Sequence, residues 1–207
     1  MMPEVQDILS HTRYLAGGFA MNLLISVLSM GIGTVIGVSL GRLRHAGWRG
    51  LELPSRLATN ICRNVPSFVL LFYMASMIPS EITISGAIYA VPLWIKATLA
   101  LIFPVVGFAS DQSLGYFAQR AAGLHGARET FLVAWAQYFL IIIMASATAS
   151  VIGANEIVGR ANAIIAQSGG NSFLITMYLY VSVWFILTGL ILTTAIKQIS
   201  QRLSGRP

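Results

Sequence analysis

Five long apolar stretches constrain this chain more than any other feature of its sequence. They lie at residues 19–41, 56–79, 93–109, 130–153 and 172–196. A helix needs about 20 mostly apolar residues to cross the hydrocarbon core of a bilayer. Helices and closed barrels are the structures that satisfy their own backbone groups there. The sequence therefore predicts an all-α, polytopic membrane bundle of about five transmembrane helices, formed as a single domain over residues 1–207.

Composition and charge agree with a membrane protein. The chain has 207 residues, of which 56% are hydrophobic and 10% are charged, whereas soluble domains have about 25% charged residues. Cys62 is the single cysteine, so no disulfide forms within the chain. The formal charge of +6 comes from basic residues beside the apolar stretches, which indicates membrane topology and no nucleic acid partner.

The basic residues also predict an orientation. With the N-terminus outside and the C-terminus inside, only Arg13, Lys96 and Arg160 of the 13 basic residues fall outside. The cytoplasmic set is then Arg42, Arg44, Arg49, Arg56, Arg63, Arg120, Arg128, Lys197, Arg202 and Arg206. Cytoplasmic loops of membrane proteins carry an excess of lysine and arginine, so we predict an N-out, C-in chain.

Residues that would support catalysis are absent from the predicted membrane segments. His11, His45 and His125 all fall in predicted loops. The sequence contains no H-E-x-x-H pair, no serine elbow and no phosphate-binding glycine loop before a lysine. We therefore predict that the chain is not an enzyme and has no catalytic, cofactor or metal site.

Small residues in the first apolar stretch predict close helix packing. Gly33, Gly37 and Gly41 recur every four residues and so share one face of a helix. Small residues at this spacing let the backbones of two membrane helices approach closely. Glycine is also common in membrane helices generally, but the regular spacing favours a packing face.

Three polar side chains are expected near membrane depth. Lys96 lies about one turn into the third stretch, where a long side chain reaches the interface, so we expect its ammonium to point outward. Gln137 and Tyr138 lie in the fourth stretch and are candidates for lining a translocation path. They are equally able to bond a neighbouring helix.

The segment 154–171 is long for a connection between helices and is moderately apolar. We expect a short interfacial or re-entrant helix that ends at Gly169 and Gly170. Asn155 and Glu156 at its start are further path candidates, because a small zwitterion needs polar partners of this kind. A solvated loop is the alternative interpretation of these two residues.

Four segments, taken in order, resemble the membrane-spanning permease subunits of bacterial ATP-binding-cassette (ABC) importers, specifically the polar amino acid branch. "GFAMNLLISVLSMGIGTVIGVSLGRLR" is similar to the opening helix of that branch, and "CRNVPSFVLLFYMASMIP" to its second helix. "ATLALIFPVVGFASD" fits the third helix, with Asp111 where the branch usually has a glutamate. "ASVIGANEIVGRANAIIA" resembles the segment after the fourth helix. The resemblance extends over residues 18–200.

The resemblance implies a type I importer fold and a role in transport. As such a permease, the chain would move polar amino acids across the bacterial cell inner membrane. Its partners would be an extracytoplasmic substrate-binding protein, a second permease subunit in a heterodimer, a separate ATPase subunit and the surrounding lipid bilayer. The alternative is a degenerate homologue that no longer couples to an ATPase and acts as a structural or regulatory membrane subunit.

The polar elbow "GLHGARET", residues 123–130, stands where these permeases carry a loop that docks into their ATPase. The Glu-Ala-Ala core of that loop aligns with Gly126, Ala127 and Arg128, so only the central alanine agrees. The region is roughly 20 residues short, which leaves too little chain for a docking helix of about two turns. A plain turn is the other interpretation. The candidates for ATPase coupling are Gly123, His125, Gly126, Ala127, Arg128 and Glu129.

Overall fold

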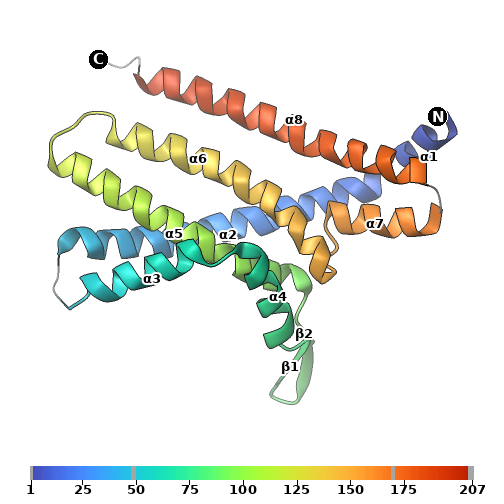
Figure 1. The fold of residues 1–207 in the computed structure, drawn as a ribbon, viewed down its shortest axis with the longest axis horizontal. Helices are drawn as coiled ribbons and strands as arrows, with labels where there is room; N and C mark the ends of the chain where they lie inside the picture. Colours follow the sequence, from blue (N-terminus) through green and yellow to red (C-terminus); the bar gives the residue numbers. More distant parts are fainter. Residues whose placement is uncertain (1, 48–49, 169–170, 205–207) are drawn as a thin grey trace.

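The computed structural model of the protein describes residues 2–47, 50–168 and 171–204. Arg49, Gly169, Gly170 and Arg206, which were discussed above, lie outside the described residues. The chain is mainly helical (Figure 1). Its elements are α1 (Met2–Ser10), α2 (Thr12–Ala46), α3 (Glu52–Asn64), α4 (Ser67–Met77), β1 (Glu81–Ile84), β2 (Ala87–Ala90), α5 (Leu93–Ala121), α6 (Ala127–Ser146), the 3₁₀ helix η1 (Ala147–Ile152), α7 (Ile157–Ser168) and α8 (Asn171–Ser204).

Four segments of the described chain are long and apolar enough to cross a membrane. They are Thr12–Ala46, Leu93–Ala121, Ala127–Ile152 and Phe173–Gln198. To within one residue at either end, these segments contain four of the five predicted spans, and their helices run along the long axis of the molecule in Figure 1. α7 supplies the short helix expected within residues 154–171. The predicted helical membrane bundle is therefore confirmed.

The fifth predicted span, residues 56–79, is wrong as a continuous helix. The structure divides it into α3, of 13 residues, and α4, of 11 residues. Between them, Val65 and Pro66 have extended backbones with ψ angles of 123° and 129°. Proline has no backbone N–H and disfavours helix in the residue before it. Each half is shorter than the roughly 20 residues that a membrane-crossing helix needs.

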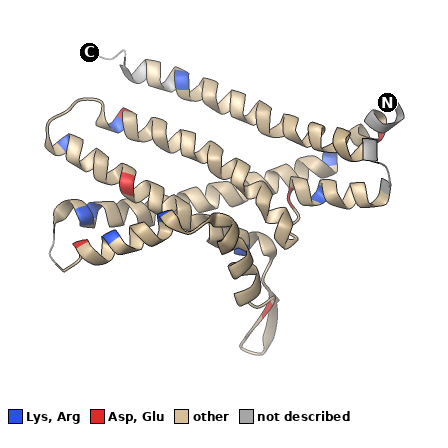
Figure 2. Ribbon diagram, viewed as in Figure 1, with Lys and Arg blue, Asp and Glu red and all other residues tan. Residues whose placement is uncertain are grey.

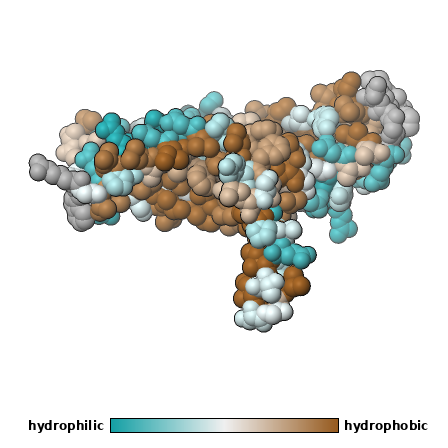
Figure 3. All heavy atoms as spheres, turned by 60° about the horizontal axis from the view of Figure 1, so that its bottom comes forward, coloured by the Kyte–Doolittle hydropathy of each residue, from teal (hydrophilic) through white to brown (hydrophobic). Residues whose placement is uncertain are grey.

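A short β-hairpin between α4 and α5 adds an element that the prediction of a helical bundle did not include. β1 and β2 pair in antiparallel register, with Ile82 opposite Tyr89. The turn residues Ser85 and Gly86 have φ angles of 52° and 85°, as in the tight turns that join neighbouring strands. Short segments with apolar residues on both sides of a Ser-Gly pair are typical of a hairpin. A search for long apolar helices does not predict it. Together with α4, the hairpin projects away from the long helices (Figures 1 and 3).

The predicted glycine face of α2 is confirmed, and it packs against α5. A Cβ atom added at Gly33 would lie 2.6 Å from the Val105 side chain. One added at Gly37 would lie 2.7 Å from the Val106 carbonyl oxygen, and one at Gly41 would collide with Ser113. Small residues therefore let these two helices approach as closely as their backbones allow.

This packing predicts that the same substitution has different effects at two positions of α2. Gly37→Ala should lower the midpoint of thermal unfolding in detergent, because the added methyl group meets backbone atoms of α5 that cannot move aside cheaply. Gly31→Ala is the matched control, since nothing lies within 4 Å of its added Cβ. Equal midpoints for the two variants would contradict the packing argument.

Basic residues gather at one end of the bundle, where α2, α5 and α8 end and α3 and α6 begin (Figure 2). The opposite end carries Arg13 and Arg160 beside α1 and α7. This separation is what a chain with one basic cytoplasmic side would show. The assignment of the basic end to the cytoplasm stays a prediction.

Candidate functional site

The elbow at the basic end is a short turn. α5 ends at Ala121 and α6 begins at Ala127, and the described chain forms no separate helix between them. The Leu124 N–H donates to the Gln119 carbonyl at 3.0 Å, and the Gly123 N–H donates to the Arg120 carbonyl at 3.1 Å. Gly123 has a left-handed backbone conformation, with φ +70°. Together with the two hydrogen bonds, it forms a Schellman motif that ends α5.

The six elbow candidates differ in what they contact. Ala127 is buried, whereas His125 and Arg128 are exposed. Glu129 accepts a hydrogen bond from the Ser200 hydroxyl at 2.8 Å, which ties the start of α6 to α8. Arg128 also borders a cavity of about 250 Å³ whose other lining residues are Val38, Ser113, Tyr116, Phe117, Phe131 and Leu132. His125 and Arg128 are thus available to a partner.

Close to the basic end, one carboxylate joins three helices. Asp111 of α5 pairs with Arg44 of α2 at 2.8 Å and with Arg63 of α3 at 2.9 Å. Arg44 also donates to the Ser110 hydroxyl at 3.0 Å, and Ser110 bonds Thr59 of α3 at 2.8 Å. The sequence singles out Asp111 through the family resemblance, and Arg44 and Arg63 only as basic residues of the predicted cytoplasmic side. It does not predict that these residues pair, because no local pattern places residues 44, 63 and 111 together.

At the opposite end, Glu156 lies fully buried at the start of α7. Its carboxylate accepts bonds from the backbone N–H groups of Val158 and Gly159, at 2.9 and 2.8 Å, and from the Asn22 amide at 3.0 Å. Asn22 also accepts from the Ile157 N–H at 3.1 Å. Burial raises the pKa of Glu156, and the hydrogen bonds from Val158, Asn22 and Gly159 partly offset that rise. This geometry gives Glu156 a capping role.

The other path candidates lie in separate places. Asn155 is exposed beside Glu156, and its carbonyl accepts a bond from the Arg160 side chain at 3.3 Å. Tyr138 donates to the Pro104 carbonyl at 3.2 Å and stacks on Phe108, with ring centroids 3.8 Å apart. Its contacts are those of a residue that packs α6 on α5.

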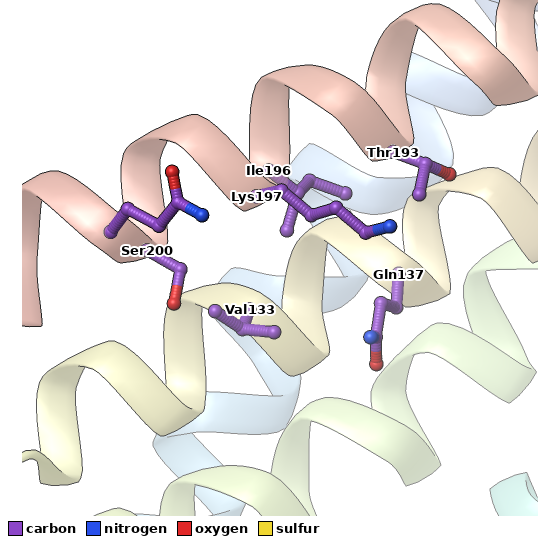
Figure 4. Close-up of a pocket in the computed structure, with 7 residues that line it drawn as sticks. Val133, Gln137, Thr193, Ile196, Lys197 and Ser200 are labelled. Atoms are coloured by element: carbon purple, nitrogen blue, oxygen red, sulfur yellow. The ribbon is translucent and has the colours of Figure 1, made fainter.

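Gln137 lies on a different side of α6. It lines a cavity of about 370 Å³ between α6 and α8 (Figure 4). The structure thus does not bring the four candidates together, and their part in a path stays a prediction.

Lys96 departs from the expectation that its ammonium reaches outward. The residue is buried, and the ammonium donates to the carbonyl oxygens of Ile78 at 2.7 Å and Ala75 at 3.2 Å. These carbonyls lie at the end of α4, where a helix has unpaired acceptors and attracts cations. The expectation was wrong because the break at Pro66 places the end of α4 beside the start of α5.

Lys96→Met should therefore loosen α4 from α5 while keeping the length of the side chain. Charge-assisted hydrogen bonds contribute about 2 kcal/mol, so a drop of several degrees in the unfolding midpoint is expected. Exchange of the α4 backbone amides with deuterium should also speed up. Lys96→Arg serves as the charge-conserving control. Unchanged exchange in α4 of the Met variant would show that Lys96 does not hold this helix.

Metal binding finds no support among the described side chains. They contain no group of three or more His, Cys, Asp or Glu residues that could hold a metal ion. His45, which was expected in a loop, lies in the last turn of α2 and stacks against Phe117, with ring centroids 5.8 Å apart.

Comparisons with known proteins agree with this architecture. No protein-family model matches the chain. Its sequence is 23% identical to the "Probable glutamine ABC transporter permease protein GlnP" of Bacillus subtilis (strain 168), over 93% of this chain and 94% of that protein. The structure matches "an amino acid ABC transporter with histidines" with a TM-score of 0.78 and 17% identity, over 96% of this chain and 98% of the other.

A second solved structure, an inward-facing form of the MetNI methionine ABC transporter, gives a TM-score of 0.68 at 19% identity. It covers 94% of this chain and 98% of its own. At these identities the structural matches establish the fold, and both extend over nearly the whole of each chain. The chain is therefore similar in sequence to an ABC transporter permease and has the fold of the matching chains of these two transporters.

Proposed function

We propose that the chain is the membrane-spanning permease subunit of an ATP-driven importer for polar amino acids. The observation that carries this proposal is the agreement of fold over 96% of the chain with an amino acid ABC transporter. The likeness to a probable glutamine permease over 93% of the chain points to the same substrate class. The protein would reside in the bacterial inner membrane as a multi-pass subunit.

The work of transport is divided among several proteins in this proposal. An extracytoplasmic binding protein delivers the amino acid, and a second permease completes the path. ATP is hydrolysed by a separate subunit, since this sequence has no nucleotide-binding motif. Alternation between inward-open and outward-open states then moves the substrate, as two packed arrangements of the same helices exchange.

The elbow is the proposed place where the ATPase acts on this chain. A force on the turn reaches α5 and α6 directly, because it joins their ends. It reaches α8 through the bond between Glu129 and Ser200. It reaches α2 and α3 through the ion pairs of Asp111 on α5. A turn without its own helix offers a small docking surface, so the partner permease would carry the larger share of coupling.

The alternative, a homologue that no longer couples to an ATPase, rests on the short elbow alone. Near-complete coverage of transporting relatives does not favour it.

The elbow role predicts a loss of ATPase binding when its charges are removed. The double variant Arg128→Ala, Glu129→Ala should reduce co-purification of the ATPase subunit about tenfold, which corresponds to the loss of one or two good interface contacts. The matched control is Asp7→Ala, Arg13→Ala, which removes one acid and one base at the opposite end. Normal ATPase binding and amino acid uptake by the elbow variant would rule out docking through these charges.

A further inference from the structure

An open, mainly apolar cavity of about 370 Å³ lies between α6 and α8 near the basic end of the bundle (Figure 4). Its lining combines an ammonium, amides and hydroxyls with two aliphatic side chains. The residues are Val133, Gln137, Thr193, Ile196, Lys197, Ser200 and Gln201.

Lys197 is the charged member of this cavity. It stands at the end of the apolar segment Phe173–Gln198, where a lysine normally extends its ammonium toward water. Figure 4 instead shows the side chain extending along the space between the helices, toward the level of Gln137 and Thr193. Within the described chain, no hydrogen bond or ion pair holds this ammonium. A cation near membrane depth is expected to pair with an anion.

The neutral polar groups of the cavity are also unsatisfied by the described protein. Gln137, Thr193 and Gln201 have no hydrogen-bond partner for their side chains among the described residues. Ser200 differs, because it already bonds Glu129. Gln137 and Thr193 lie within segments long and apolar enough to cross a membrane, where unpaired donors and acceptors are costly. A polar ligand that enters from the membrane would satisfy them.

The lining residues place neutral polar groups and apolar groups around the Lys197 ammonium. Figure 4 shows this side chain extending toward Gln137 and Thr193, so a phosphate bound by Lys197 would also meet their side chains. Val133 and Ile196 give the same cavity apolar walls. A ligand with an anionic headgroup joined to acyl chains would match this combination.

We infer that this cavity is a binding site for one anionic phospholipid of the leaflet that faces the basic end. Basic pockets between helices on the cytoplasmic side of a membrane are suited to anionic headgroups. The site holds α6 against α8 beside the Glu129–Ser200 bond, so the bound lipid would stiffen the helix pair that carries the elbow. The inference requires a membrane-inserted chain and does not depend on which molecule the protein transports.

Native mass spectrometry of the full chain tests this inference. The protein is reconstituted in nanodiscs of equimolar phosphatidylglycerol and phosphatidylcholine, released into detergent and examined for retained phosphatidylglycerol. Lys197→Gln should lower the retention of one phosphatidylglycerol about tenfold, as expected for one charge-assisted contact. Val133→Phe should do the same by filling the cavity while keeping the charge. Lys197→Arg should retain the lipid.

Arg120→Gln is the matched control, because it removes an exposed charge at the same end outside the cavity. Equal loss of lipid in Lys197→Gln and Arg120→Gln would overturn the inference in favour of unspecific attraction by surface charge. Unchanged lipid retention in both Lys197→Gln and Val133→Phe would also overturn it. If glutamine added to the wild-type protein displaced the lipid, the cavity would belong to the substrate path instead.

Discussion

Asp111→Asn is expected to destabilise the protein more than any other single change considered for the basic end. The substitution removes the charge that Arg44 and Arg63 share and leaves the mostly buried Arg44 guanidinium without its anion. Breaking one side of a fully buried ion pair costs about 3 kcal/mol or more, and this cluster is only partly buried, so we expect a cost of about 2 kcal/mol. The midpoint of thermal unfolding in detergent, followed by tryptophan fluorescence, should fall by about 5 °C.

Two variants control this prediction. Asp111→Glu keeps the charge and should have most of the stability of the wild-type protein. The permeases that the sequence resembles usually have a glutamate at this position. Asp7→Asn removes a carboxylate that lies exposed on α1 and should leave the midpoint unchanged. If Asp111→Asn unfolded at the wild-type temperature, the carboxylate would not be what joins α2, α3 and α5.

Glu156→Ala should have an effect of similar size at the other end of the bundle. The change leaves the N–H groups of Val158 and Gly159 without their acceptor in a buried place, and it removes one of the two acceptors of the Asn22 amide. Unsatisfied buried donors cost about 1–3 kcal/mol each. We expect a loss of about 3 kcal/mol in the free energy of unfolding, and faster deuterium exchange in α7.

Asn155→Ala is the matched control, because this neighbour is exposed and only its backbone carbonyl makes a described hydrogen bond. Uptake assays on the same two variants also address the proposed path. Reduced uptake by a stably folded Asn155→Ala protein would support a path beside α7. A Glu156→Ala protein with normal stability and no uptake would contradict the capping role and favour direct contact with substrate.

The parts of the fold that follow a local pattern could be predicted from the sequence. The packing face of α2 could be predicted from spacing alone, because every fourth residue of a helix returns to the same side. The residues are Gly33, Gly37 and Gly41. Apolar length likewise located four spans, and proline at position 66 is a residue type that kinks or ends helices. The extent of the break at Pro66 and the hairpin after it were missed, because a search for apolar spans overlooks short strands.

The parts that depend on distant contacts could not be predicted. Lys96 was expected to point outward, but the end of α4 offers its ammonium two carbonyl oxygens. Asn22 is not identified as a candidate from the sequence, although its amide donates hydrogen bonds to Glu156 and Ser146 of two other segments. Such pairs are 18 to 134 positions apart in the chain, so no periodicity links them.

Transport in a defined system tests the central claim most directly. The chain would be reconstituted in proteoliposomes with an ATPase, a second permease and a binding protein encoded beside it, and uptake of labelled glutamine would be measured. The proposal predicts uptake that requires ATP, the binding protein and this chain together. Assembly of the complete complex without ATP-dependent uptake of glutamine or any other polar amino acid would contradict it.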